Sequence, residues 1–177
     1  MARVDAFQED DERVMSPPLV PVAMIIIAIA WLLQWLQPIQ IISDVAFIED
    51  IDPDYLAAMG LAVAIAGVSL SASGCHALKK RGGVVNPLPF PKTLVTDGVF
   101  RWTRNPGYLG ILITLLGVAL IFEFDWLLIL IVPAWVILNL TVVRHEELYL
   151  RHKFGAAYQD YAKRVPRYFF IRPAGPA

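Results

Sequence analysis

Two short clusters place charged and polar side chains directly beside apolar stretches. The first is the run Arg101–Gly110 (RWTRNPGYLG), where a basic loop passes into an apolar segment. The second is Arg144–Glu147 (RHEE), which follows the last long apolar run. Such groups can bind anions, orient a substrate or move protons, so both clusters are candidate parts of one site at a membrane boundary.

The pair Asn105-Pro106 allows two interpretations. Asparagine is a favoured N-cap and proline is favoured at the first helical position, so the pair can simply begin a helix. Alternatively, the free amides and the positive dipole end of that helix bind an anion, with Arg101 and Arg104 adding positive charge. The sequence leaves both interpretations open.

The acidic pair Glu146 and Glu147 is equally ambiguous. A charged collar is common where an apolar helix leaves the lipid, and this is the structural interpretation. Adjacent carboxylates at a membrane boundary, with Arg144 nearby, are nevertheless costly if partly buried, which makes all three candidate catalytic residues.

The sequence predicts no disulfide and no metal site. Cys75 is the single cysteine, so the chain cannot form an internal disulfide. The three histidines, His76, His145 and His152, have no recognised ligand spacing. We also expect no nucleic-acid partner.

Composition predicts an all-α, polytopic membrane protein. Hydrophobic residues make up 57% of the 177 residues, against roughly 45–50% in soluble domains. We expect a single membrane-embedded domain over residues 1–177 that begins with a polar tail, residues 1–16. About 20 apolar residues are needed to cross the hydrocarbon core. The expected transmembrane helices are Leu19–Leu36, Tyr55–Leu78, Pro106–Phe122 and Trp126–Val143.

Small residues and turns predict how these helices are arranged. Gly60, Gly67 and Gly74 recur every seven residues, so one face of the second helix should allow close approach of a neighbour. The third and fourth helices are separated only by residues 123–125, which predicts an antiparallel hairpin. Pro133 should kink the fourth helix.

The basic residues predict the orientation. Of the 15 Lys and Arg residues, two lie in the tail, six in residues 79–104 and seven from Arg144 onward. Four crossings place these three segments on one side, which the positive-inside rule makes cytoplasmic. Both termini are therefore expected in the cytoplasm, with residues 38–54 and 123–125 outside, and we expect a bacterial-type inner membrane.

A fifth, amphipathic helix is predicted after the fourth apolar run. Apolar residues recur at steps of three and four, with charged residues between them, and Gly155 is a candidate bend. We expect this helix to rest on the membrane surface. Its apolar face consists of Leu150, Phe154, Tyr158, Tyr161 and Val165.

In order and spacing, these motifs resemble the isoprenylcysteine carboxyl methyltransferases and the related phospholipid N-methyltransferases. The resemblance covers roughly residues 92–167, and the first two helices contribute no motif. One departure is Asn105, where the isoprenylcysteine enzymes usually have histidine. The matching pieces are Asp97–Arg101, Arg104–Gly110, Glu146–Leu148, Phe154–Tyr161 and Val165–Arg167.

The resemblance implies S-adenosylmethionine as cofactor and a lipophilic small molecule or lipid-modified acceptor that enters from the bilayer. Arg144, Glu146 and Glu147 would then act at the reaction centre. The oligomeric state is left open. The cofactor-binding residues that the resemblance implies are Arg104, Asn105, Pro106, Tyr108, Glu146, Glu147, Tyr158 and Tyr161.

Several functions remain open at this point. The leading candidate acceptor is the carboxylate of a prenylated cysteine. A phospholipid amine and a small lipophilic thiol or amine are the alternatives. Membrane sterol and enone reductases, which use NADPH, resemble the same C-terminal half but are normally longer. A non-catalytic membrane interaction protein would leave the clustered polar residues without a shared purpose.

Overall fold

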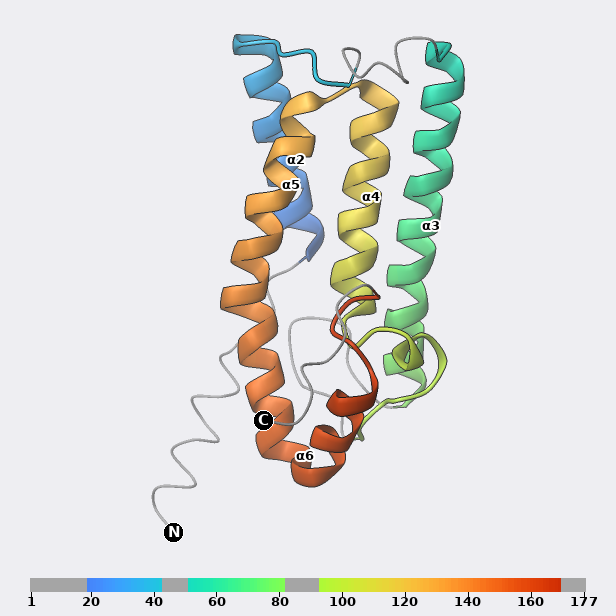
Figure 1. The fold of residues 1–177 in the computed structure, drawn as a ribbon, viewed down its shortest axis with the longest axis vertical. Coiled ribbons are helices and arrows are strands. Elements are labelled where there is room, and N and C mark those ends of the chain that lie inside the picture. The colour runs from blue at the N-terminus through green and yellow to red at the C-terminus, as the bar shows by residue number, and fades with distance from the viewer. Residues whose placement is uncertain (1–18, 43–50, 82–92, 170–177) are drawn as a thin grey trace. The chain divides into compact units, whose positions relative to one another are not determined.

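The structure is a computed structural model that describes residues 19–42, 51–81 and 93–169 (Figure 1). The polar tail and the prolines at 87, 89 and 91 lie outside these residues. Every regular element in the described part is helical, as the composition predicts. The helices are α2 (Leu19–Leu36), α3 (Pro53–Lys80), the 3₁₀ turn η1 (Gly98–Arg101), α4 (Pro106–Phe122), α5 (Asp125–Leu138), the π-helical segment η2 (Asn139–Val143) and α6 (Arg144–Arg164).

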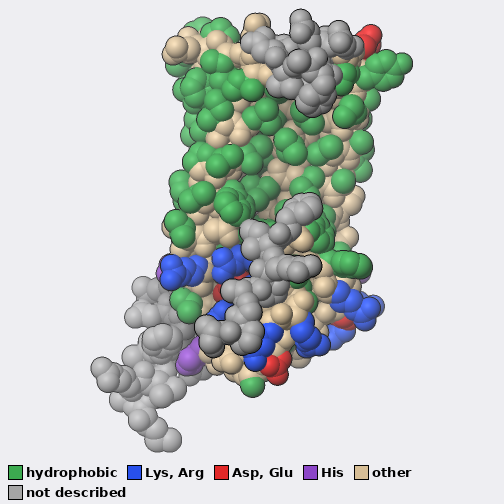
Figure 2. Space-filling model, in the orientation of Figure 1, with side chains coloured by type: hydrophobic (Ala, Val, Ile, Leu, Met, Phe, Trp, Pro, Cys, Tyr) green, Lys and Arg blue, Asp and Glu red, His purple; other side chains and the backbone are tan. Residues whose placement is uncertain are grey.

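The chain divides into two compact units. We call residues 19–71 and 107–137 the apolar unit, since they hold α2, most of α3 and α4, and α5. We call residues 72–106 and 138–177 the polar unit. Figure 2 shows mainly hydrophobic side chains on the apolar unit, whereas Lys and Arg side chains gather on the polar unit.

The core of the apolar unit joins α2, α4 and α5. Ala30 of α2, Leu115 and Ala119 of α4, and Leu127 of α5 are buried against one another. Many other large hydrophobic side chains of this unit are exposed, among them Trp31 and Trp35. Apolar side chains that point outward from a small apolar core are what a lipid-facing bundle requires.

Helices α3 and α4 meet through their glycines. A Cβ added at Gly67 would lie 2.5 Å from the backbone nitrogen of Thr114 and 2.6 Å from the carbonyl oxygen of Gly110. A Cβ at Gly117 would lie 2.4 Å from the nitrogen of Ala64 and 2.6 Å from the carbonyl oxygen of Gly60. The two backbones are therefore in contact, which confirms the close approach predicted from the glycine spacing.

The turn between α4 and α5 forms the expected hairpin. Helix α4 ends at Phe122 and α5 begins at Asp125, with Glu123 in the left-handed region at a φ of 50°. The Asp125 carboxylate is buried and accepts hydrogen bonds from the backbone amides of Ile41 and Ile42, at 3.1 and 2.7 Å. The carboxylate thus ties the loop after α2 to the start of α5.

Two helices are long and apolar enough to span a membrane. They are α3 and the continuous helix from Asp125 to Arg164, which combines α5, η2 and α6. Helices α2 and α4 are also apolar but shorter. By length and composition, the described part of the chain therefore contains two candidate membrane spans and two shorter apolar helices.

The continuous helix from Asp125 to Arg164 departs from regular α-helical geometry at two places. Pro133 lies inside α5, and the π-helical segment η2 begins six residues after it. Gly155 breaks α6 with a φ of 53° and a ψ of −128°, which confirms the predicted bend. A positive φ with this ψ is accessible mainly to glycine because it has no Cβ.

The amphipathic face predicted for the last helix is also confirmed. Tyr158, Tyr161 and Val165 are buried against Val95 and Phe100, and Leu150 and Phe154 pack at the edge of this cluster. The helix begins without interruption at the end of η2, however. The predicted separate element is therefore the later part of one continuous helix, and Gly155 lies inside it.

Candidate functional site

A cavity in the polar unit brings the two polar clusters of the sequence together. Its volume is about 60 Å³, and it is partly open to solvent. Its lining combines apolar side chains with charged and hydroxyl-bearing ones. The lining residues are Leu78, Leu94, Val95, Phe100, Arg104, Asn105, Glu146, Glu147, Leu150, Tyr158 and Tyr161.

The loop before α4 is fixed by hydrogen bonds at both ends of its short turn. Tyr161 donates its hydroxyl proton to the carbonyl oxygen of Phe100 at 2.8 Å. Thr103 is fully buried, and its hydroxyl accepts from the backbone nitrogen of Asn105 at 3.2 Å. Asn105 is the last residue before α4, as the capping interpretation predicts, and it also lines the cavity, as the functional interpretation requires.

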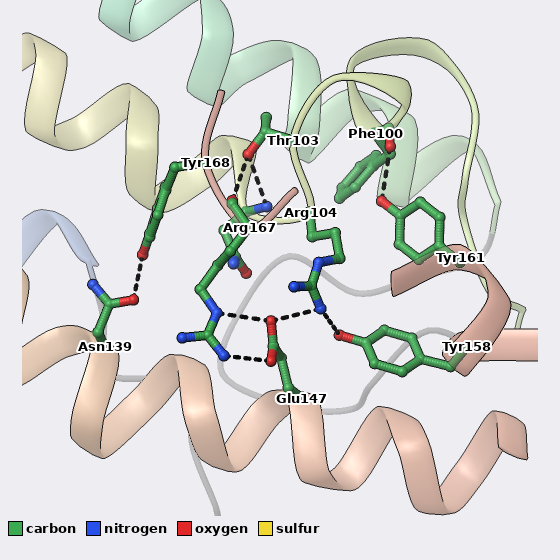
Figure 3. A network of polar contacts seen from close by, with 10 residues as sticks. Phe100, Thr103, Arg104, Asn139, Glu147, Tyr158, Tyr161, Arg167 and Tyr168 are labelled. Atoms are coloured by element: carbon green, nitrogen blue, oxygen red, sulfur yellow. Dashed lines mark hydrogen bonds and ion pairs between the residues drawn. The ribbon is translucent and has the colours of Figure 1, made fainter. Parts of the chain in front are cut away.

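Glu147 is the centre of a buried ionic cluster (Figure 3). Arg104 Nη1 lies 2.9 Å from Glu147 Oε1, and both side chains are more than 90% buried. Arg167 donates to the same carboxylate at two points, from Nε to Oε1 at 3.0 Å and from Nη2 to Oε2 at 2.6 Å. One buried carboxylate is therefore shared by two guanidinium groups.

The segment after α6 is attached to this cluster through its backbone as well. The Pro166 carbonyl oxygen accepts from the backbone nitrogen of Arg104 at 3.0 Å, and the Arg167 carbonyl oxygen accepts from the Thr103 hydroxyl at 2.8 Å. The Tyr168 hydroxyl donates to Asn139 Oδ1 at 3.0 Å. Figure 3 shows these contacts converging from the loop, the π segment and the C-terminal segment.

Burial, neighbouring charges and hydrogen bonds shift the pKa values of Tyr158 and Arg167. Tyr158 follows the break at Gly155, outside the apolar stretch, and its hydroxyl lies 3.4 Å from Arg104 Nη1. Burial first, and then the Glu147 charge, raises the pKa of Tyr158 above its usual 10.0, while Arg104 opposes the rise. The hydrogen bonds to Glu147 raise the pKa of Arg167, so this arginine stays charged.

Two buried donors in the cavity wall have no hydrogen-bond partner among the residues that the structure describes. They are Arg104 Nε and Asn105 Nδ2. A buried polar group that lacks a hydrogen bond costs about 1–3 kcal/mol, and more if it is charged. Two adjacent donors of this kind in one cavity are suited to an anionic or carbonyl-bearing ligand.

The structure brings together most of the residues proposed from the sequence, but not all. Arg104, Asn105, Glu146, Glu147, Tyr158 and Tyr161 line the cavity, as proposed. Among the described residues, the lining does not include Arg144, Pro106 or Tyr108. Arg144 is exposed, Pro106 is buried at the first position of α4, and Tyr108 is buried within the apolar unit.

Arg167 and Thr103 were not proposed as site residues, yet both hold the cluster together. Arg167 ends the motif Val165-Pro166-Arg167, but its position after the last helix favoured a solvated tail. The sequence did carry a signal for Arg167. It follows a valine of the apolar face and a proline, so the fold fixes its position. Thr103 carried no signal beyond its place between two residues of the first cluster.

No group of three or more potential metal ligands occurs within the described ranges.

Residues 55–157 match the model of the phospholipid methyltransferase family, which is more than half of the chain. The chain belongs to this family. The match of a membrane methyltransferase family agrees with the apolar helices and the cavity, and enzymes of this family use S-adenosylmethionine.

The curated relatives of this phospholipid methyltransferase family member include protein-S-isoprenylcysteine O-methyltransferases. The enzyme from Schizosaccharomyces pombe is 35% identical over 74 residues, which are 41% of this chain and 31% of the relative. The enzyme from Mus musculus is 39% identical over 82 residues, 42% of this chain and 26% of the relative. The chain thus spans less than a third of each relative's length. No solved structure matches significantly.

Proposed function

We propose that this chain is an integral membrane methyltransferase that uses S-adenosylmethionine and methylates a lipophilic acceptor, with a prenylcysteine-like carboxylate as the leading candidate. The observation that carries the proposal is the pair of unpaired buried donors, Arg104 Nε and Asn105 Nδ2, in the cavity wall. Family membership supports methyl transfer over NADPH-dependent reduction.

The residues of the cavity fit the charged and apolar parts of S-adenosylmethionine. Arg104 and Asn105 provide donors for its carboxylate, and Glu146 provides a negative charge for its ammonium or sulfonium group. Apolar side chains such as Leu94 and Phe100 provide a surface for the adenine ring. When bound, the cofactor supplies a methyl group on a sulfonium, and in-line transfer of that group depends mainly on positioning.

The hydrogen bonds of Glu147 bear on the choice of acceptor. A protonated amine must first lose a proton to a base, whereas a carboxylate is already ionised near neutral pH. Both oxygens of Glu147 are occupied by arginine donors, so this residue is poorly placed to act as a base. A carboxylate acceptor, which needs no base, stays the leading candidate, with a phospholipid amine or a small lipophilic thiol or amine as alternatives.

The proposed topology has four membrane crossings with both termini in the cytoplasm. It is supported by the four apolar helices and by the confinement of Lys and Arg to three segments. Labelling of a single cysteine placed at the exposed Trp102, in a Cys75→Ser background, tests it in intact cells. We expect no reaction with an impermeant reagent until the membrane is opened. Labelling before the membrane is opened would indicate the opposite orientation.

The function is tested by binding and by transfer with the purified protein. Calorimetry in detergent should show binding of S-adenosylmethionine and S-adenosylhomocysteine without added metal. Labelled S-adenosylmethionine should then methylate acetyl-farnesylcysteine in preference to phosphatidylethanolamine and lipophilic thiols. Binding of NADPH with no response to S-adenosylmethionine would contradict the proposal, and transfer only to a water-soluble acceptor would contradict entry from the bilayer.

Asn105→Ala separates the two interpretations of that residue. If its amide binds the cofactor, affinity should fall about tenfold or more, the scale of one lost hydrogen bond to a charged group. The unfolding temperature should change little. Lower stability with unchanged affinity would show that Asn105 serves only as a helix cap.

A further inference from the structure

The way in which two arginines share Glu147 is unequal. Arg167 contacts both carboxylate oxygens, whereas Arg104 contacts only Oε1. A two-point contact between guanidinium and carboxylate is the geometrically preferred and stronger arrangement. Arg167 therefore makes the two-point contact with Glu147 that Arg104 would otherwise make.

Because of this unequal sharing, Arg104 keeps positive charge and hydrogen-bond donors that Glu147 does not use. The three side chains carry two positive charges and one negative charge within one buried cluster. Arg104 uses Nη1 for Glu147 and Tyr158, and within the described part of the chain its Nε has no hydrogen-bond partner. If Arg167 were removed, Arg104 could pair with both oxygens of Glu147, which would neutralise it and turn it away from the cavity.

We propose that Arg167 is a positioning residue, which restricts Arg104 to a one-point contact with Glu147 and so keeps Arg104 available for the carboxylate of the bound cofactor. The inference rests on the proposed function. It assigns Glu147 the role of a shared anchor for two arginines and Arg167 the role of setting the anion affinity of the cavity.

A purely structural role would predict something different. In that case Arg167 would only attach the C-terminal segment to the loop before α4. Yet this attachment already has two backbone contacts, from Arg104 nitrogen to the Pro166 carbonyl and from the Thr103 hydroxyl to the Arg167 carbonyl. Neither contact uses the Arg167 side chain, so replacing that side chain should leave the segment in place.

The test compares two ligands that differ in the amino-acid part. S-adenosylhomocysteine carries the carboxylate, and 5′-methylthioadenosine lacks it. For Arg167→Met, calorimetry should show an affinity for S-adenosylhomocysteine reduced about tenfold or more, and an affinity for 5′-methylthioadenosine changed less than about twofold, since only the former depends on Arg104. Equal losses for both ligands, or no loss for either, would overturn the proposal.

Two further variants keep the test decisive. Arg167→Lys retains the charge but cannot make the planar two-point contact, so we expect an intermediate, ligand-selective loss. It also replaces Arg167→Met as the deciding variant if that protein does not fold. Arg164→Met, at an exposed arginine in the last turn of α6, should leave both affinities unchanged. Failure of the unaltered protein to bind either ligand would instead contradict the proposed function.

Discussion

Each unit of the molecule buries one carboxylate among its described residues, and the two are satisfied in opposite ways. Asp125 in the apolar unit is 3% exposed and accepts from the backbone amides of Ile41 and Ile42. Glu147 in the polar unit is 5% exposed and accepts from the side chains of Arg104 and Arg167.

The two kinds of hydrogen-bond partner suit two different roles, one in the fold and one in a binding site. Backbone amides have one donor each, so Ile41 and Ile42 have none left for a ligand once they bind Asp125 Oδ1. Guanidinium groups have five donors, so the contacts of Glu147 leave further donors directed to their surroundings. A buried acid held by backbone anchors a loop, whereas a buried acid held by arginines can organise a binding site.

The comparison is most severely tested by Glu147→Gln. The change removes the charge that the buried Arg104 side chain shares with the partly exposed Arg167, and breaking a buried ion pair costs about 3–5 kcal/mol. Turnover should fall at least about tenfold, equivalent to about 1.4 kcal/mol of transition-state stabilisation. Thermal unfolding in detergent and a methyl-transfer assay measure the two effects. Asp160→Asn, at an exposed acid of the same helix, is the control; full activity in Glu147→Gln would contradict the assigned role.

Asp125→Asn tests the other half of the comparison. An amide keeps one acceptor oxygen but loses the charge, so the bonds from Ile41 and Ile42 weaken, and stability should fall by about 1–3 kcal/mol. The KM for S-adenosylmethionine should stay the same in the protein that remains folded. A changed KM at unchanged stability would mean that Asp125 affects the site and that the division between the units is wrong.

Gly67→Ala tests whether the apolar unit is held by direct backbone contact. The new Cβ would lie 2.5 Å from the Thr114 nitrogen, so the helices must separate, at a cost of about 1–3 kcal/mol. The unfolding temperature in detergent should fall accordingly. Ala66→Ser, at the exposed neighbouring position, is the control and should be neutral. Equal stability of Gly67→Ala and the control would rule out the tight α3–α4 contact.

The smallest expected effect concerns pH. Burial raises the pKa of Tyr158, and also that of Tyr161, above the unfolded value. The folded chain then holds these protons more tightly, so their contribution to stability is constant below about pH 10 and declines as the pH rises further. Unfolding temperatures measured across this range should fall less steeply for the double variant Tyr158→Phe/Tyr161→Phe. Identical profiles would show that the two hydroxyls are not buried from water.

The sequence predicted the helices well because their ends carry strong local signals. Helix α2 has the expected bounds Leu19–Leu36, and α4 has the expected bounds Pro106–Phe122. Proline at the start of α4 and the acidic turn after it specify both ends locally. The glycine spacing of α3 was enough to predict close approach of a neighbouring helix. Such packing requires small residues at the contact, whichever helix the partner is.

The site was predicted only in part, because its decisive contacts are not local. Sequence proximity indicated that Arg104 and Glu147 belong near a site, but not that they form an ion pair across 43 positions. Nor did it show that Arg167 completes the cluster. The side chains of Arg144 and Glu147 lie three positions apart, yet one is exposed and the other buried, which only tertiary packing decides.

The π-helical segment η2 also makes the register of this helix vulnerable to a change in length. It holds about one residue more per turn than an α-helix would. It begins at Asn139, which binds Tyr168, and ends four residues before Glu147, which binds Arg167. Those two partners are consecutive residues, so the angular offset between Asn139 and Glu147 along the helix must match one step of the C-terminal segment. Deleting a single residue from 140–143 would restore regular helix while rotating Glu147 away from Arg167. In this protein the extra residue thus sets the angular position of Glu147 on the helix. A homologue that lacks it would keep its helix but would need a different partner for its buried acid.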